Sequence, residues 1–167
     1  MTEATPLRVW TGAHLMTGGY GGWAFVRAHG GVVVGAAGGE RRTSLVRAEL
    51  TGLVEALATA DAGRSPVVVH AASDGLLAGL RALKGWRLAG WVDADESPVP
   101  NADLWRRLGE RLAALGSASI MKLPAPSTAK DAASFVHEWA SLAADKVRAQ
   151  PTFRAAIPKP NLARFPG

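Results

Sequence analysis

The chain has 167 residues, of which 48% are hydrophobic and 20% charged, and its formal net charge is +5. This composition excludes an intrinsically disordered chain, and the length is that of one domain with a real core. No apolar run approaches the ~20 residues that a membrane-spanning helix needs, and the lack of cysteine excludes disulfides and thiolate metal sites. The basic charge gives weak support to a polyanionic partner, because many basic proteins never bind nucleic acid.

The first third of the chain predicts an antiparallel meander of strands. Residues 7–11 alternate in polarity, residues 23–27 follow a glycine-rich stretch, and residues 32–36 follow the turn His29-Gly30-Gly31. Short turns of this kind join strands that run antiparallel. We therefore expect three neighbouring strands before the first helix.

Helical spacing begins after residue 45. The apolar residues of 46–61 recur at the i, i+3, i+4 and i+7 positions of one helix face. The run Val67-Val68-Val69 has no polar alternation, which is typical of a strand buried on both faces. The further expected elements are a helix from Ser73 or Asp74 to Leu83, a helix over 102–115, a strand over 119–123 and a helix from Ser127 or Thr128 to about Ala149. This order predicts an α/β fold, a mixed five-stranded sheet with helices on both faces.

The two ends of the chain carry separate expectations. Met1–Pro6 shows no basic stretch followed by an apolar one, so we expect no signal peptide and, with no cysteine, a cytoplasmic location. We expect one folded domain over 1–150. Residues 151–167 form a basic tail that contains prolines and no acidic residue, and this tail either packs on the domain, hangs free or docks on a partner through Pro158-Lys159-Pro160.

Four short motifs stand in a fixed order on these elements. They are Gly21-Gly22-Trp23-Ala24, Arg47-Ala48-Glu49-Leu50, Trp86 with Gly90-Trp91, and the stretch from Pro98 to Trp105 that reads Pro-Val-Pro-Asn-Ala-Asp-Leu-Trp. In sequence and order they resemble type 1 ribonuclease H over about residues 7–123. The resemblance implies a ribonuclease H-like fold and, in an active member, cleavage of the RNA strand of an RNA/DNA hybrid.

Most of the acidic residues of that family are missing here. In an active member four carboxylates hold two divalent ions, Mg²⁺ or Mn²⁺, that activate water and stabilise the leaving oxygen. The resemblance places the first carboxylate on Gly12 and the third on Ala72, and it keeps only the helix glutamate, Glu49, as a catalytic and metal-binding residue. We therefore expect no bound cofactor, unless the protein is active with Mg²⁺ or Mn²⁺.

The fourth carboxylate position, on the last helix, is ambiguous. It falls on Ser141 if His137-Glu138-Trp139-Ala140 matches the family's Asn-Glu-x-Ala, and otherwise on Asp145 or Asp131. Asp74 lies two residues after Ala72 and is a further candidate catalytic residue. The alternatives are structural: a helix N-cap for Asp74, a first-turn carboxylate for Asp131 and a surface ion pair for Asp145.

The region that binds the nucleic-acid substrate in many family members also has less net positive charge here. Lys84, Trp86 and Arg87 are the candidate nucleic-acid-binding residues, in the region that is a basic handle in many family members. Asp93, Asp95 and Glu96 follow them, so this handle is nearly neutral. The tryptophans are candidates either for base stacking or for core packing, and we expect core packing.

Three hypotheses for function follow. The first is a catalytically impaired ribonuclease H-like protein, a pseudoenzyme that binds nucleic acid, such as an RNA/DNA hybrid, or a protein partner. The second is an active nuclease in which Glu49, Asp74 and one of Asp131 or Asp145 form a rebuilt site. The third is a protein-interaction module on the same fold. A transition metal held by His14, His70 and Glu49 is a further alternative, although nothing in the spacing demands it.

Overall fold

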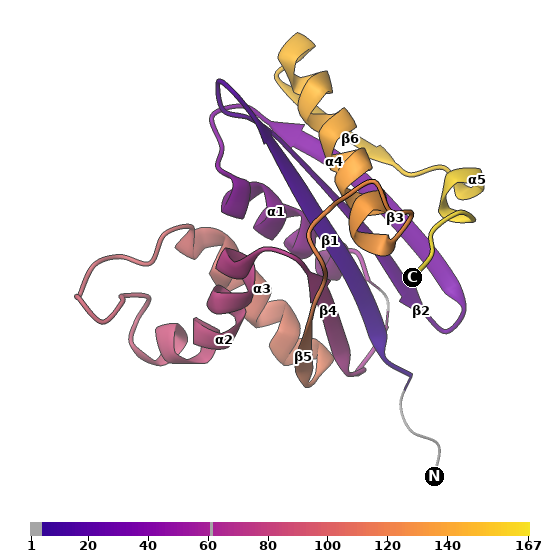
Figure 1. The fold of residues 1–167 in the computed structure, drawn as a ribbon. Coiled ribbons are helices and arrows are strands. Elements are labelled where there is room, and N and C mark those ends of the chain that lie inside the picture. The colour runs from indigo at the N-terminus through magenta and orange to yellow at the C-terminus, as the bar shows by residue number, and fades with distance from the viewer. Residues whose placement is uncertain (1–4, 61) are drawn as a thin grey trace.

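The computed structural model describes residues 5–60 and 62–167. Most of the N-terminal segment considered above for a signal peptide, residues 1–4, and the last residue of the helix expected over 46–61 lie outside these ranges. Figure 1 shows the elements β1 (Leu7–Met16), β2 (Tyr20–His29), β3 (Val32–Glu40), α1 (Leu45–Ala58), β4 (Val67–Ala71), α2 (Asp74–Leu88), α3 (Ala102–Leu115), β5 (Ala118–Lys122), α4 (Ala132–Ala149), β6 (Thr152–Ala156) and α5 (Lys159–Leu162). Within these ranges no helix has the length and apolarity needed to cross a membrane.

The strands form one mixed sheet in the order β5-β4-β1-β2-β3-β6. The meander β1–β2–β3 is antiparallel, as the sequence predicts, while β4 pairs parallel with β1 and with β5. The expectation of a mixed sheet with helices on both faces is confirmed. The sheet has six strands rather than five, because the tail supplies β6, which pairs antiparallel with β3 and covers what would otherwise be a free sheet edge.

Helices α1–α3 lie on one face of the sheet and α4 on the other (Figure 1), and an apolar layer fills the space on each face. One lies between the sheet and α1–α3 and includes Leu50, Leu53 and Val69, all fully buried. The other lies beneath α4 and the tail and includes Val136 and Ile157. The tail is therefore part of the packed structure.

Glycines on the sheet let α4 lie unusually close to it. A Cβ at Gly22 of β2 would overlap the carbonyl oxygen of Ala140, and one at Gly39 of β3 would lie 3.0 Å from the carbonyl oxygen of Ala143. Since backbone atoms of a helix cannot swing away as a side chain can, any larger residue at Gly22 pushes α4 off the sheet. This close approach fixes the position of α4 over β2 and β3.

The start of α4 differs from the prediction. The helix begins at Ala132 rather than at Ser127 or Thr128, and its N-cap is Asp131, whose carboxylate accepts a 2.8 Å hydrogen bond from the Ser134 N–H. The Ser134 hydroxyl also bonds with Ser127, donating to its carbonyl oxygen and accepting from its N–H, so the preceding segment folds back as a loop. That loop, 123–131, runs from the end of β5 to α4.

Candidate functional site

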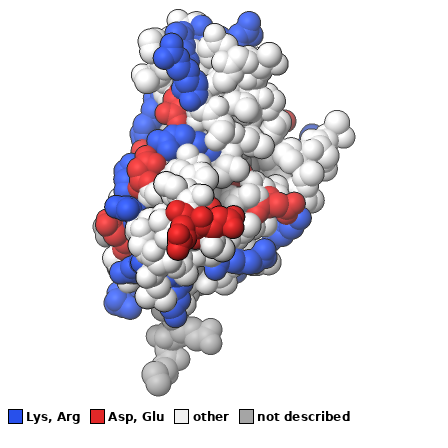
Figure 2. All heavy atoms as spheres, turned by 90° about the vertical axis from the view of Figure 1, so that its left-hand side faces the viewer, with Lys and Arg blue, Asp and Glu red and all other residues white. Residues whose placement is uncertain are grey.

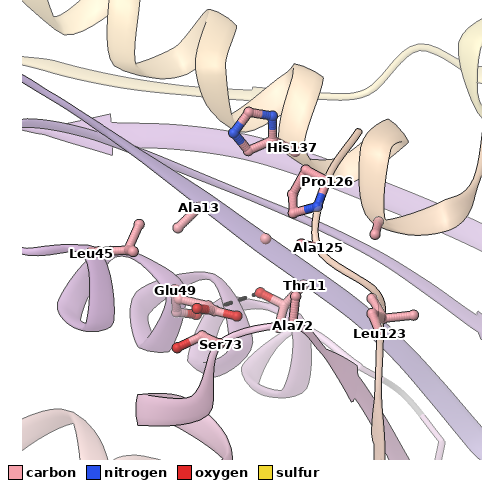
Figure 3. A pocket seen from close by; sticks show the side chains of 12 residues that line it. Thr11, Ala13, Leu45, Glu49, Ala72, Ser73, Leu123, Ala125, Pro126 and His137 are labelled. Atoms are coloured by element: carbon pink, nitrogen blue, oxygen red, sulfur yellow. Dashed lines mark hydrogen bonds between the residues drawn. The ribbon is translucent and has the colours of Figure 1, made fainter. Parts of the chain in front are cut away.

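A cavity of about 210 Å³ opens where β1, β4, α1 and α4 meet, at the place the resemblance assigns to the metal site. Its residues come from the centre of β1, the N-terminal half of α1, the end of β4, the 123–131 loop and the start of α4. In Figure 3 the oxygen atoms of Thr11, Glu49 and Ser73 gather on one side, and His137 and Pro126 lie on the opposite side. The apolar lining residues are Gly12, Ala13, Leu45, Ala72, Leu123, Ala125, Pro126 and Ala133.

Among the residues that the structure describes, Glu49 is the one carboxylate that lines this cavity. It lies on α1 and is only 3% exposed. Burial raises its pKa to about 7, while hydrogen bonds from the Ser73 hydroxyl and backbone N–H act in the opposite direction. The Thr11 hydroxyl lies 3.5 Å from the backbone oxygen of Glu49 and 3.4 Å from that of Ala24, and it ties α1 to β1 and β2. Glu49 therefore lines the cavity from α1, the helix on which the resemblance places it.

The positions aligned with the first and third carboxylates, Gly12 and Ala72, both line the cavity. A Cβ at Gly12 would lie 2.9 Å from Cγ2 of Val136 on α4, closer than real Cβ atoms approach. A side chain at this position therefore needs α4 or Val136 to move. Ala72 presents only a methyl group, so neither position supplies a metal ligand.

On α4 the residues that face the cavity are Ala133 and His137, and Ser141 does not line it. The His137 ring meets the His14 ring edge to face, with centroids 5.1 Å apart. Burial, and then the charge of His14, lower the pKa of His137, which favours its neutral form. His137 was not predicted from the sequence as a lining residue. The usable signal was its i+4 spacing from Ala133 on the first turns of α4.

The other acidic candidates lie outside the cavity and have other partners. Asp74 pairs with Lys122 at 2.8 Å, and that ion pair lowers the pKa of Asp74. Asp131 caps α4, and its hydrogen bonds with Ser134 lower its pKa. Asp145 pairs with Arg148 at 3.3 Å on the exposed face of α4. The structure thus does not bring these three carboxylates together with Glu49.

The histidine candidates do not converge on Glu49 either. His70 stacks on Trp10 with ring centroids 4.7 Å apart and lies 3.4 Å from an Arg8 guanidinium nitrogen, whereas His14 pairs with His137. Burial first and the charge of Arg8 second lower the pKa of His70. Throughout residues 5–60 and 62–167 no group of three His, Cys, Asp or Glu side chains has metal-binding geometry.

This set of donors does not fit a two-metal site. Mg²⁺ and Mn²⁺ prefer carboxylate oxygens, and a pair of such ions needs several of them. The cavity offers one buried carboxylate, the hydroxyls of Thr11 and Ser73, and the imidazole of His137. The Glu49 carboxylate can accept hydrogen bonds from a bound molecule, and the apolar lining residues can contact the rest of that molecule's surface.

The candidate nucleic-acid residues lie on α2. Lys84 and Arg87 are exposed, while Trp86 packs edge to face against the buried Trp105, with centroids 5.5 Å apart. Trp23 and Trp105 are 5% and 2% exposed, so core packing is confirmed for them. Figure 2 shows basic side chains above and below a band of acidic ones on this side of the molecule.

Comparisons with known proteins find ribonuclease H relatives by sequence and by fold. A ribonuclease H from Saccharopolyspora erythraea is 38% identical over 93 residues, which cover 55% of this chain and 60% of that protein. The crystal structure of a type 1 ribonuclease H with the type 2 active-site motif superposes with a TM-score of 0.70 at 16% identity, over 98% of this chain and 82% of the other. The foamy viral protease-reverse transcriptase in complex with RNA/DNA hybrid gives 0.66 at 16% identity, over 87% of this chain and 20% of that one.

The curated relatives are longer than the stretch they share with this chain. The chain spans about three fifths of the length of the ribonuclease H proteins that it matches. The structural likenesses, at low sequence identity, show the fold alone. The sequence profile of the RNase H family matches residues 7–144, most of the chain. With the motif order and the sheet topology, this match shows that the chain belongs to the ribonuclease H family.

Proposed function

We propose that this family member binds nucleic acid of the RNA/DNA-hybrid class and does not cleave it by the two-metal route. The observation that supports the loss of cleavage most directly is the lining of the cavity, in which one carboxylate, Glu49, is surrounded by apolar groups. Without a second and third carboxylate, nothing holds the ions that would generate the nucleophile and stabilise the leaving group.

Binding rests on charge and on family membership. The chain has a net charge of +5, and exposed basic residues occur on α2, at Lys84 and Arg87, and beyond β3, at Arg41 and Arg42. Phosphate contacts from such residues supply most of the affinity of sequence-independent binding. One solved relative of the same fold is a complex with an RNA/DNA hybrid, which makes a hybrid the first ligand to test.

The test measures fluorescence anisotropy of a labelled RNA/DNA hybrid over a series of salt concentrations, without divalent ions. The proposal predicts binding that weakens steeply with salt, and a Lys84→Ala/Arg87→Ala variant whose log–log salt slope is smaller by roughly 2, at about 0.9 per lost phosphate contact. The matched control, Lys159→Ala/Arg164→Ala, removes two exposed charges from the tail and should keep the slope. Absence of binding, or binding that ignores salt, would contradict the proposal.

A further inference from the structure

The cavity around Glu49 combines an apolar wall with one deeply buried carboxyl group. Leu45, Leu123 and Pro126 form part of the wall, and Glu49 lies with Ser73 and Thr11 on one side (Figure 3). Sites for small molecules commonly have this composition, a mostly apolar surface with a few placed polar groups. The cavity therefore has the properties of a pocket for an organic ligand.

Glu49 has no basic partner that acts on it. Apart from burial, only the hydroxyl and N–H of Ser73 change its pKa, and no Lys, Arg or His side chain of the described residues contributes. His137, at the other side of the cavity, has its pKa lowered and so favours its neutral form. Ionising a buried carboxyl group without a counter-charge is costly, and a cation that enters the cavity offsets that cost and favours the ionised form of Glu49.

The volume limits the ligand. The cavity holds about 210 Å³, below the roughly 300–1,000 Å³ of pockets for drug-sized molecules. A hydrated Mg²⁺ ion keeps its waters and gains little from apolar walls such as Leu45 and Leu123. A neutral apolar guest would cover Glu49 without satisfying its charge. The cavity therefore fits a small guest that is apolar over most of its surface and has a cationic donor at one end.

We propose that this cavity binds a small organic cation, with a primary ammonium or amidinium group on the Glu49 carboxylate and an apolar body against Leu45, Leu123 and Pro126. The ammonium group donates to the carboxylate, and such charge-assisted hydrogen bonds are about twice as strong as neutral ones. The site is separate from the phosphate-binding residues proposed on α2, so it does not depend on hybrid binding.

The test titrates the whole 167-residue chain, above pH 7 so that Glu49 is ionised, with benzylamine and, as a neutral analogue, benzyl alcohol, by calorimetry and ¹H–¹⁵N correlation spectra. We expect benzylamine to shift the amide signals of Gly12, Ala13 and Ser73, and to bind at least about tenfold more tightly than benzyl alcohol. The variant Glu49→Gln should lose that preference, while Glu110→Gln, which removes an exposed carboxylate of α3, should keep it.

A second variant tests the cavity without changing Glu49 and is checked for correct folding. Ala72→Leu fills part of the cavity and leaves Glu49 in place, so it should weaken both guests, with circular dichroism reporting an intact fold. The proposal is overturned if benzylamine shifts none of the lining amides, if the two guests bind equally to the unmodified protein, or if Glu49→Gln binds benzylamine as tightly as the parent. It is supported if the preference for the cation is present and disappears with Glu49 alone.

Discussion

The buried carboxyl of Glu49 makes the stability of this protein depend on pH in a direction opposite to that of most carboxylates. Burial raises its pKa in the folded state to about 7 from an ordinary value of 4.5. Between these values the folded chain keeps a proton that the unfolded chain has lost, so the free energy of unfolding falls as the pH rises. The difference corresponds to about 3 kcal/mol, at about 1.4 kcal/mol per pH unit.

The perturbation that tests this is Glu49→Gln, which keeps the shape and one hydrogen-bond-accepting oxygen but removes the charge. We expect the variant to gain about 3 kcal/mol relative to the parent between pH 4.5 and pH 8. Comparison with the parent cancels other titrations, such as those of Asp74 and Asp103, whose lowered pKa values act in the opposite direction. Urea unfolding followed by tryptophan fluorescence measures the difference at each pH. A difference independent of pH would refute the reasoning.

Three further predictions concern the glycines and the metal. Gly12→Ala should lower the free energy of unfolding in urea by about 1–3 kcal/mol, because its Cβ meets Val136. The double variant Gly12→Ala/Val136→Ala should lose less than the sum of the two single variants, and strict additivity would contradict this contact. Gly22→Ala should lower the melting temperature further than Gly12→Ala, because its Cβ overlaps the Ala140 carbonyl; equal or smaller loss would count against this. Millimolar MgCl₂ should raise the melting temperature no more than NaCl of equal ionic strength, whereas a specific rise would indicate a metal site.

Much of the fold was predictable from the sequence because local and long-range signals agree. Helical spacing located α1 and α3, and the order of four family motifs fixed the sheet type. The sixth strand was not predicted, because β6 is short and its partner β3 lies more than a hundred residues away in the chain. The start of α4 was misplaced because Ser127, Thr128 and Asp131 are all acceptable N-caps, and only the contacts of Ser134 select Asp131.

The candidate site was predictable on β1, α1 and β4, where a short family motif sets the register, and not on α4, where no such motif does. Gly12, Glu49 and Ala72 lie together as expected, since the middle of β1, the helix α1 and the end of β4 meet at one edge. The α4 residue was missed because His137, Ser141 and Asp145 are spaced four residues apart and share one face of the helix. A shift of one or two turns along α4 therefore exchanges them. The apolar character of the cavity depends on the 123–131 loop, whose path no sequence pattern specified.

The measurement that tests the central claim most directly is cleavage of a labelled RNA/DNA hybrid with Mg²⁺ or Mn²⁺, run beside Glu49→Gln purified in the same way. The account predicts no cleavage by the parent, or equal traces in both preparations from a contaminating nuclease. Cleavage by the parent that Glu49→Gln abolishes would contradict it, and would mean that carboxylates now apart, such as Asp74 and Asp131, come together with Glu49 when substrate binds.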